Sequence, residues 1–290
     1  MTEAAEQPPQ GIQPEAKVEL ASAPEFSPSA EVNHQNGEQA REDGRFDDAF
    51  ANYYVALKQY GAQENHLQIA ETHLGIGLTH LRLSTMADQE KDKSTSQHRL
   101  NLARMNMNMG LQIAQKHDDR VTAVIPRAYF RVADAQIKLL PKDKTALTLF
   151  TKAIEEREKR FPAGIAETGQ YRYQYGDALC GADRTEEGIQ ALKQGQLEIE
   201  QNPNTIGGGE ADLNARYTWL VWNSGACMRL AARLAQADAK KPQAERSNEW
   251  HGYINKARCL VESIAKEFPT KTLRVADLGE VEKELAALIA

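Results

Sequence analysis

The histidines of one predicted helix are the first residues whose spacing suggests chemistry. His66, His73 and His80 recur every seven residues, so they share a helix face within about 20°. Consecutive members are about 10.5 Å apart along the axis, because a helix rises 1.5 Å per residue. Zinc requires ligands about 2.0–2.1 Å from one centre, so two of these histidines cannot bind one ion. The spacing therefore predicts either a polar stripe or ordinary surface and half-buried histidines, and no metal site.

No motif for catalysis or cofactor binding is complete in this sequence. Di-iron helical bundles use Glu-x-x-His twice, whereas here Glu31 and His34 form it once. Gly75 and Gly77 begin a dinucleotide fingerprint, but its third glycine is missing and no strand precedes it. The chain also lacks a phosphate-binding loop, a Gly-x-Ser-x-Gly motif and a Cys-x-x-Cys motif. We therefore expect a protein that is not an enzyme and has no cofactor.

The charged residues and cysteines limit the class of protein. The net charge is −6, with 35 basic and 41 acidic residues mixed along the chain, so we expect no nucleic-acid partner. The three cysteines, Cys180, Cys227 and Cys259, are widely spaced on apolar helix faces. An odd number in this pattern is typical of buried free thiols in a reducing compartment.

The start of the chain and its apolar stretches bear on localisation. Residues 1–6 lack the basic start and apolar core of a secretory signal. No run of about 18 apolar residues is present to cross a bilayer. We therefore expect a cytoplasmic protein without membrane insertion.

Proline divides the chain into two parts. Residues 1–29 contain five prolines among many Glu, Ala and Ser residues, a composition with too little apolar surface to offset the entropy of ordering. We expect a disordered tail, either inert or serving as a tether or binding motif. Residues 30–290 are rich in helix-forming residues and poor in strand-forming ones, so we expect one helical domain there.

The helical part contains a repeated pattern of paired helices. Ala146 in one pair aligns with Gly188 in the next, a period of 42 residues, which is typical of stacked supersecondary units. Small residues such as Gly176 and Gly188 let neighbouring helix backbones approach closely. The expected hairpins span residues 31–60, 64–117, 120–161, 169–202 and 210–268, and a capping helix spans 272–290.

Two points in this division stay open from the sequence. Residues 84–97 are polar and longer than a normal turn, so they form either a loop or the extended ends of both helices in the second hairpin. The register of the fifth hairpin is also ambiguous. Trp250, Ile254 and Ala257 fit one face of its second helix, which we expect to run from about Ala244 to Phe268.

Three hairpins carry residues of a known repeat pattern. The matching positions are Gly44, Phe46, Ala49, Tyr53 and Ala56 in the first hairpin, Leu74, Gly75 and Leu78 in the second, and Ala146, Phe150 and Ala153 in the third. This series resembles the tetratricopeptide repeat (TPR) family. The usual TPR period is 34 residues, so a period of 42 adds about two helical turns. The chain thus resembles the longer, kinesin-light-chain-like variant.

This resemblance implies an all-α, right-handed superhelical solenoid of about five TPR-like hairpins with a C-terminal capping helix. It also implies a partner-binding groove on the inner face of each first helix. In the expected register this face carries His34, Glu38, Arg41, Thr72, His73, Ile76, Thr79, Arg131, Lys138, Tyr173, Gln174 and Asp177. The family's carboxylate-binding groove uses Lys, Asn and Arg at set positions, where this chain has Thr72, Ile76 and Ala135. Arg131 and Lys138 remain available for one carboxylate.

Three function hypotheses follow from these sequence patterns. The first is a non-catalytic scaffold or adaptor that binds a peptide or partner domain in its concave groove, and the mixed polar and charged inner face favours it. The second is a structural subunit of a larger assembly or homo-oligomer, which a broad apolar patch would favour. The third is an enzyme or ligand sensor on a helical scaffold. The sequence identifies neither the partner nor the oligomeric state.

Overall fold

The computed structural model describes residues 26–117, 124–163, 165–203, 213–271 and 273–289. Within these ranges all regular structure is helical, with eleven α-helices, one short 3₁₀-helix and no strand. The expected all-α class is therefore confirmed for the part of the chain that is described. No helix in this part has the length and apolarity needed to cross a membrane.

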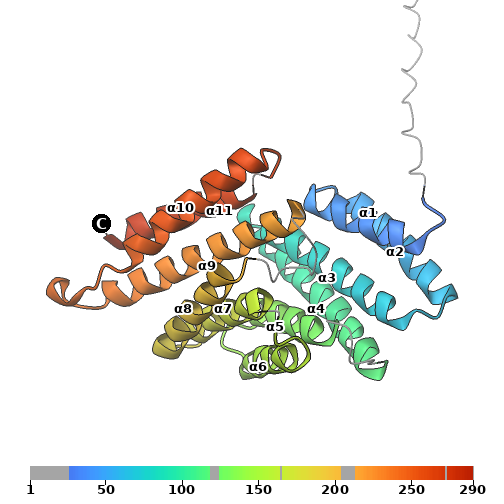
Figure 1. Cartoon of the computed structure of the whole chain (residues 1–290), viewed down its shortest axis with the longest axis horizontal. Helices are drawn as coiled ribbons and strands as arrows, with labels where there is room; N and C mark the ends of the chain where they lie inside the picture. Colours follow the sequence, from blue (N-terminus) through green and yellow to red (C-terminus); the bar gives the residue numbers. More distant parts are fainter. Residues whose placement is uncertain (1–25, 118–123, 164, 204–212, 272, 290) are drawn as a thin grey trace, which may run out of the picture.

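The α-helices follow one another in pairs (Figure 1). Their bounds are α1 (Ala30–Glu42), α2 (Phe46–Ala62), α3 (His66–Gln89), α4 (Lys93–Lys116), α5 (Val124–Leu139), α6 (Lys144–Arg160), α7 (Ile165–Gly181), α8 (Thr185–Gln201), α9 (Leu213–Ala239), α10 (Trp250–Glu267) and α11 (Leu273–Ile289). Each odd-numbered helix from α1 to α9 packs on the helix after it, and each even-numbered helix from α2 to α8 packs on the next pair. This arrangement is consistent with an α-solenoid, in which each hairpin buries its apolar face against its neighbours.

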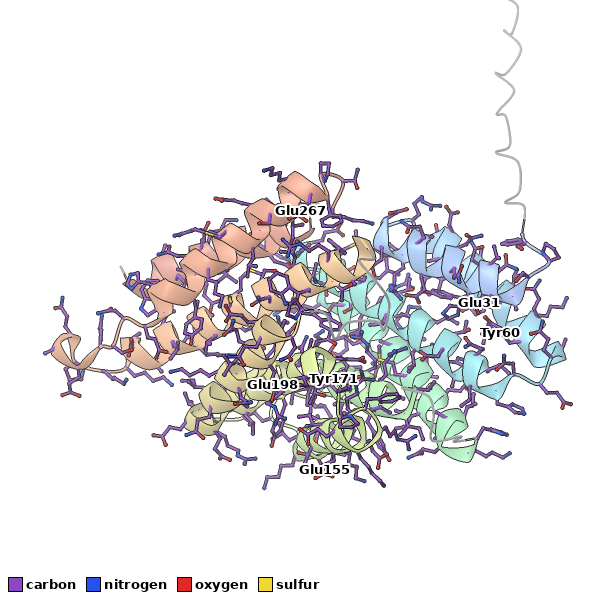
Figure 2. All side chains as sticks on the ribbon, in the orientation of Figure 1. Glu31, Tyr60, Glu155, Tyr171, Glu198 and Glu267 are labelled. Carbon is purple, nitrogen blue, oxygen red and sulfur yellow. The ribbon has the colours of Figure 1, made fainter. Side chains whose placement is uncertain are left out.

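The first helices of the pairs form one continuous layer. α1 contacts α3, α3 contacts α5, α5 contacts α7, and α7 contacts α9. The terminal helix α11 packs on α9 and α10, where Leu285 is buried. Side chains fill the space between the helices: Tyr171 lies inside the molecule, whereas Glu155 lies at its edge (Figure 2). One face of this layer, formed by α1, α3, α5, α7 and α9, points toward the interior of the array.

The segment 84–97 belongs to two extended helices rather than to a loop. α3 continues to Gln89 and α4 begins at Lys93, so only three residues form the turn. In that turn Lys91 has a positive φ of 63°, and the Asp92 side chain accepts a hydrogen bond from the Thr95 amide at 3.0 Å. This cap satisfies an amide at the start of α4, so the polar sequence is compatible with helix on both sides.

Close approach of α7 and α8 confirms the expected role of two glycines. A Cβ atom on Gly176 would lie 2.6 Å from the Gly188 carbonyl oxygen, and one on Gly169 would lie 2.7 Å from the Gly195 carbonyl oxygen. These distances are shorter than side-chain carbons tolerate, so the two backbones touch at both points. Between the first two hairpins, the buried Tyr53 ring fills the space beside Gly75 instead.

The fifth pair confirms one expectation and corrects another. Trp250, Ile254 and Ala257 are all buried on α10, so the expected register is correct. The helix begins at Trp250 rather than near Ala244, because residues 243–245 form a separate 3₁₀ turn.

The cysteines do not all lie in apolar surroundings. Cys227 is buried and Cys180 is half-buried, whereas Cys259 is exposed, which corrects the expectation of three buried thiols. Cys259 follows the buried Ala257 by two residues, a rotation of about 200° around the helix. It therefore lies on the face of α10 opposite to the buried stripe.

The first hairpin and the segment after α10 meet in space (Figure 1). The Lys271 ammonium donates a hydrogen bond to Asp43 Oδ1 at 3.2 Å, across 228 residues of sequence. The two ends of the array are thus neighbours, and the odd-numbered helices surround a common interior. The expected tail lies largely in residues 1–25, outside the described part of the chain, and its disorder stays a prediction.

Candidate functional site

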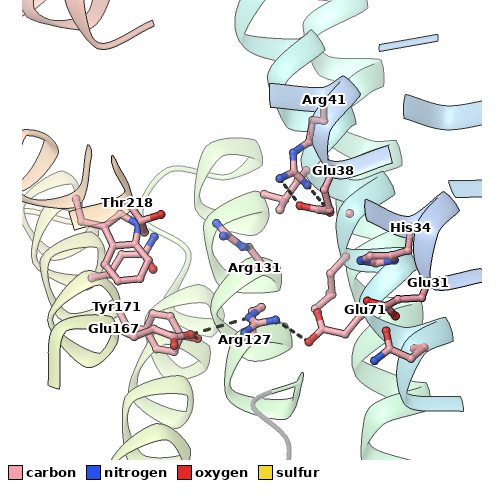
Figure 3. A pocket seen from close by; sticks show the side chains of 16 residues that line it. Glu31, His34, Glu38, Arg41, Glu71, Arg127, Arg131, Glu167, Tyr171 and Thr218 are labelled. Carbon is pink, nitrogen blue, oxygen red and sulfur yellow. Dashed lines mark hydrogen bonds and ion pairs between the residues drawn. The ribbon is translucent and has the colours of Figure 1, made fainter. Parts of the chain in front are cut away.

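A cavity of about 600 Å³ lies inside the array, and we call it the central cavity (Figure 3). The described residues that line it all belong to the first helices of the five pairs. α1 contributes four residues, α3 five, α5 two, α7 three and α9 two: Glu31, His34, Glu38, Arg41, Gln68, Glu71, Leu74, Gly75, Leu78, Arg127, Arg131, Glu167, Gln170, Tyr171, Thr218 and Trp222. Helices far apart in sequence therefore meet around one space that faces inward.

Two of the three arginines in the central cavity are paired. Arg41 binds Glu38 at 2.5 Å, and the Tyr53 hydroxyl donates to the same carboxylate at 2.6 Å. Burial alone raises the pKa of Glu38, but Arg41 and Tyr53 outweigh it and lower that pKa below its usual value. Arg127 binds Glu71 at 2.6 Å, and its Nε lies 4.0 Å from Glu167. The Arg127 pairs join the second, third and fourth hairpins around the cavity, whereas the Arg41 pair lies within the first.

Arg131 is the exception among these arginines. In the described part of the chain no hydrogen bond or ion pair reaches its guanidinium, and its Nε is buried without a partner. The guanidinium carbon lies 4.9 Å from the centre of the Phe130 ring. Burial lowers the pKa of Arg131, and attraction from Asp134 does not offset it. Because arginine stays protonated in proteins, the cavity presents a positive charge with unused donors.

Apolar and aromatic side chains surround this charge. Leu74, Leu78 and Trp222 line the same cavity. Tyr171 is 1% exposed and stacks on Phe130, with ring centres 4.3 Å apart and planes at 11°. The described part of the cavity lining includes four carboxylates and three guanidiniums. The cavity can therefore hold a ligand that joins a single negative charge to an apolar group.

A second, smaller cavity of about 200 Å³ lies among α5, α6, α7 and α9, and we call it the lateral cavity. Its lining residues are Asp134, Ile137, Lys138, Pro141, Lys142, Phe150, Gln174, Asp177, Ala178, Gly181, Arg229 and Arg233. Lys138 binds Asp134 at 3.0 Å. Arg229 and Arg233 both reach Asp177, at 3.4 and 2.7 Å. Four cations thus face two carboxylates in this space.

Most of the residues expected in a groove fall into these two cavities. His34, Glu38, Arg41 and Arg131 line the central cavity, and Lys138, Gln174 and Asp177 line the lateral cavity. The sequence grouped Arg131 with Lys138 as two ligands for one carboxylate. The structure separates them, because Lys138 binds Asp134 and faces the other cavity.

Five expected groove residues lie elsewhere. Thr72, Ile76, Thr79 and Tyr173 are each at most 1% exposed, and His73 is half-buried with its Nδ1 3.3 Å from Asn106 on α4. Thr72, Ile76, Thr79 and Tyr173 pack between helices, so the expectation that they contact a partner is wrong. For His73, which is half-buried, it stays a prediction.

The error on α3 has a simple geometric form. The residues of α3 that line the cavity include Glu71, Gly75 and Leu78, each one position before the residue that the sequence suggested. One residue rotates the helix face by about 100°, which exchanges the inner face for the face packed on neighbours.

Sequence reasoning also missed Glu71, Arg127 and Glu167. Arg127 lies four residues before Arg131 on the same helix, so the i, i+4 rule would have placed it on the same face. Its partners Glu71 and Glu167 come from two other helices. No local signal in the sequence indicates those two contacts.

The histidine stripe of α3 does not form a site. His66 stacks on His117 with ring centres 3.8 Å apart, His73 faces Asn106, and the ring of His80 is 4.7 Å from that of Phe50. The three side chains therefore contact three different neighbours. Among the described residues no group of three or more His, Cys, Asp or Glu side chains is suited to bind a metal ion.

Comparisons with known proteins give little beyond this geometry. No protein-family model and no curated protein matches the chain. Similar solved structures include the DHF58 filament (12% identity, 83% of this chain and 99% of that one, TM-score 0.29). Others are the de novo designed helical repeat protein DHR64 (17%, 78% and 98%, 0.25) and a computationally designed self-assembling cyclic homo-oligomer (11%, 90% and 94%, 0.27). These TM-scores are too low to support an argument.

Proposed function

We propose that the protein is a cytoplasmic, non-catalytic scaffold that binds a peptide or a segment of a partner protein in the central cavity. The proposal includes a right-handed superhelix of TPR-like hairpins with the longer repeat. One observation supports it above the others. The unpaired guanidinium of Arg131 lies in a cavity that all five first helices line.

The energetics of Arg131 favour a bound anion. A buried charge without a partner is costly, and a charge-assisted hydrogen bond to a carboxylate is among the stronger polar contacts in proteins. A carboxylate from a ligand would give Arg131 a partner of the kind that Arg41 and Arg127 already have. The adjacent Leu78 and Trp222 would cover an apolar side chain next to that carboxylate. A peptide with an acidic group beside an apolar residue supplies both parts.

The acids of the central cavity are suited to structure more than to catalysis. A general base at neutral pH needs a pKa near 7, whereas the pKa of Glu38 is lowered. Glu71 and Glu167 are both engaged by Arg127. These pairings support a binding role for the cavity.

A structural subunit of a larger assembly or homo-oligomer is the second candidate. Met105 and Met109 lie four residues apart on α4 and are 62% and 50% exposed. Residues at this spacing share a helix face, and exposed methionines are common at adaptable binding surfaces. This pair gives the second candidate a specific surface to test.

A pull-down from the source lysate tests both candidates. Wild-type protein is compared with Arg131→Gln, with Met105→Glu/Met109→Glu, and with the control Arg258→Gln, which removes an exposed arginine of α10. We expect a partner that Arg131→Gln loses and the other two variants keep. Equal recovery by Arg131→Gln and wild type would contradict the proposal, and loss with the methionine variant alone would favour the second candidate. Thermal melts verify that every variant is folded.

A further inference from the structure

The side chains that line the lateral cavity carry more positive than negative charge, and two further acids act from outside the lining: Asp183 pairs with Lys142, and Asp277 of α11 attracts Arg229. Its lining holds Lys138, Lys142, Arg229 and Arg233 against Asp134 and Asp177. Lys142 also contacts Asp183, at 2.7 Å, but both side chains of that pair are largely exposed. The balance differs in sign from that of the central cavity, where carboxylates outnumber guanidiniums by one.

The two arginines of α9 retain unused hydrogen-bond donors. Arg233 donates through Nε to Asp177 and through Nη1 to Gln236. Arg229 approaches Asp177 through Nε, at 3.4 Å. Within the described part of the chain, Nη2 of Arg233 and both Nη nitrogens of Arg229 make no hydrogen bond. Two guanidiniums one helical turn apart therefore share one carboxylate and have donors free for a further anion.

We propose that the lateral cavity binds a phosphoryl group, carried by a phosphorylated side chain of the peptide that the central cavity holds. This inference rests on the function proposed above and specifies the ligand further. A phosphorylated residue carries a charge of about −1.5 to −2 at pH 7 and three strong acceptor oxygens. That charge matches the excess of the lateral cavity, and arginine forks suit phosphate geometry.

The charge balance distinguishes the two cavities as binding sites. In the central cavity a phosphate dianion would lie among four carboxylates, with only Arg131 free to pair. In the lateral cavity a single carboxylate would leave part of the positive charge unpaired. The geometry therefore favours a carboxylate at Arg131 and a phosphoryl group at Arg229 and Arg233.

The spacing along α9 relates the two cavities. Trp222 lines the central cavity and Arg229 lines the lateral cavity. Seven residues of helix separate them by about 10.5 Å, and an extended peptide advances about 3.3 Å per residue. A ligand that reaches both cavities should therefore carry its acidic residue about three positions from its phosphorylated residue.

Two synthetic peptide libraries test this inference on the 290-residue chain. Both have a fixed glutamate and a fixed serine three positions apart in random sequence, and in one library the serine is phosphorylated. Fluorescence polarisation should show about tenfold tighter binding of the phosphorylated library. Arg229→Gln/Arg233→Gln should remove this preference, and the exposed Lys142→Gln, which leaves no buried charge unpaired, should reduce it. Arg258→Gln on α10 should leave it unchanged.

Each outcome bears on a different part of the proposal. Equal binding of both libraries by wild-type protein overturns the phosphoryl site but leaves the scaffold function, which Arg131→Gln then tests with the unphosphorylated library. Binding of neither library overturns both. In a parallel arm, inorganic phosphate at the same concentration should raise the melting midpoint less than the phosphorylated library does. Equal stabilisation by inorganic phosphate would show that the lateral cavity binds free phosphate, and would overturn the proposal that a peptide carries the phosphoryl group.

Discussion

Partners, more than residue type, decide what each charged side chain of this protein can do. Arg41 and Arg127 are held by carboxylates, whereas Arg131 in the same cavity is not. The first two are engaged by other side chains of the protein, and the third has donors without a partner among the described residues. Burial acts in the same residue-specific way on histidines, because it removes the water that stabilises the charged ring.

His80 should make the stability of the protein depend on pH. Burial, together with the nearby Arg99 and His98, lowers the pKa of His80 to about 4, whereas an unfolded histidine has a pKa of about 6.5. Between these values the unfolded chain binds more protons, so stability present above pH 6.5 is lost as the pH falls toward 4. From pH 7 to 4.5, wild type should lose roughly 2–3 kcal/mol more than His80→Gln.

Urea unfolding at the two pH values measures this difference. His251→Gln is the matched control, because His251 is an exposed histidine on α10 and is not among the groups that act on His80. It should respond to acid much as the wild type does. Equal losses in wild type and His80→Gln would show that His80 does not contribute to acid sensitivity.

At the scale of the helices, close backbone contact decides which positions accept a side chain. α7 and α8 meet at two glycine pairs, and in that contact neither backbone can move without disturbing the other helix of the hairpin. α10 packs through larger side chains, such as Trp250 and Ile254. Its Gly252 has open space where a Cβ would lie. An added side chain should therefore affect stability differently at Gly176 and at Gly252.

Gly176→Ala should destabilise the fold, since the new Cβ would meet the Gly188 carbonyl oxygen and the Leu192 amide. We expect a loss of about 1–3 kcal/mol in the free energy of unfolding. Gly252→Ala, the matched control, should leave stability unchanged or raise it by up to about 1 kcal/mol. Guanidinium unfolding of both variants is the measurement. A neutral Gly176→Ala would mean that α7 and α8 lie farther apart than the structure indicates.

At the scale of the whole molecule, the array returns on itself so that its first hairpin meets the segment after α10 (Figure 1). The central cavity depends on this return, because α1 and α9 both line it. Packing within each helix pair and between consecutive pairs holds most of the array together. The Asp43–Lys271 ion pair joins the ends, and both side chains are partly exposed.

Lys271→Ala should change stability little. A partly exposed ion pair contributes about 0–1 kcal/mol, and about 1 M salt should abolish even that contribution by screening. Lys283→Ala removes an exposed pair within α11 and is the control for loss of a surface lysine. Urea unfolding at low and high salt checks the prediction. A loss above about 2 kcal/mol would show that closure of the array, and not sequential packing, holds the fold.

Local sequence was enough to place most of the helices. Apolar spacing and small residues indicated the hairpins, and local rules were sufficient because helix formation depends on neighbours within a few residues. The pattern around Ala146 and Gly188, for example, needed no knowledge of the partner helix. The expectation that the first helices supply the inner face came from the resemblance to the TPR family.

The inward face of each helix and the charges left unpaired depend instead on long-range packing. One residue of error on α3 exchanges Ile76 for Gly75, because each residue turns a helix by about 100°. Arg127 and Arg131 are the same residue type on the same helix, yet only Arg127 meets Glu71, 56 positions away in sequence. Such contacts depend on distances of a few ångströms between distant segments, and local sequence does not encode them.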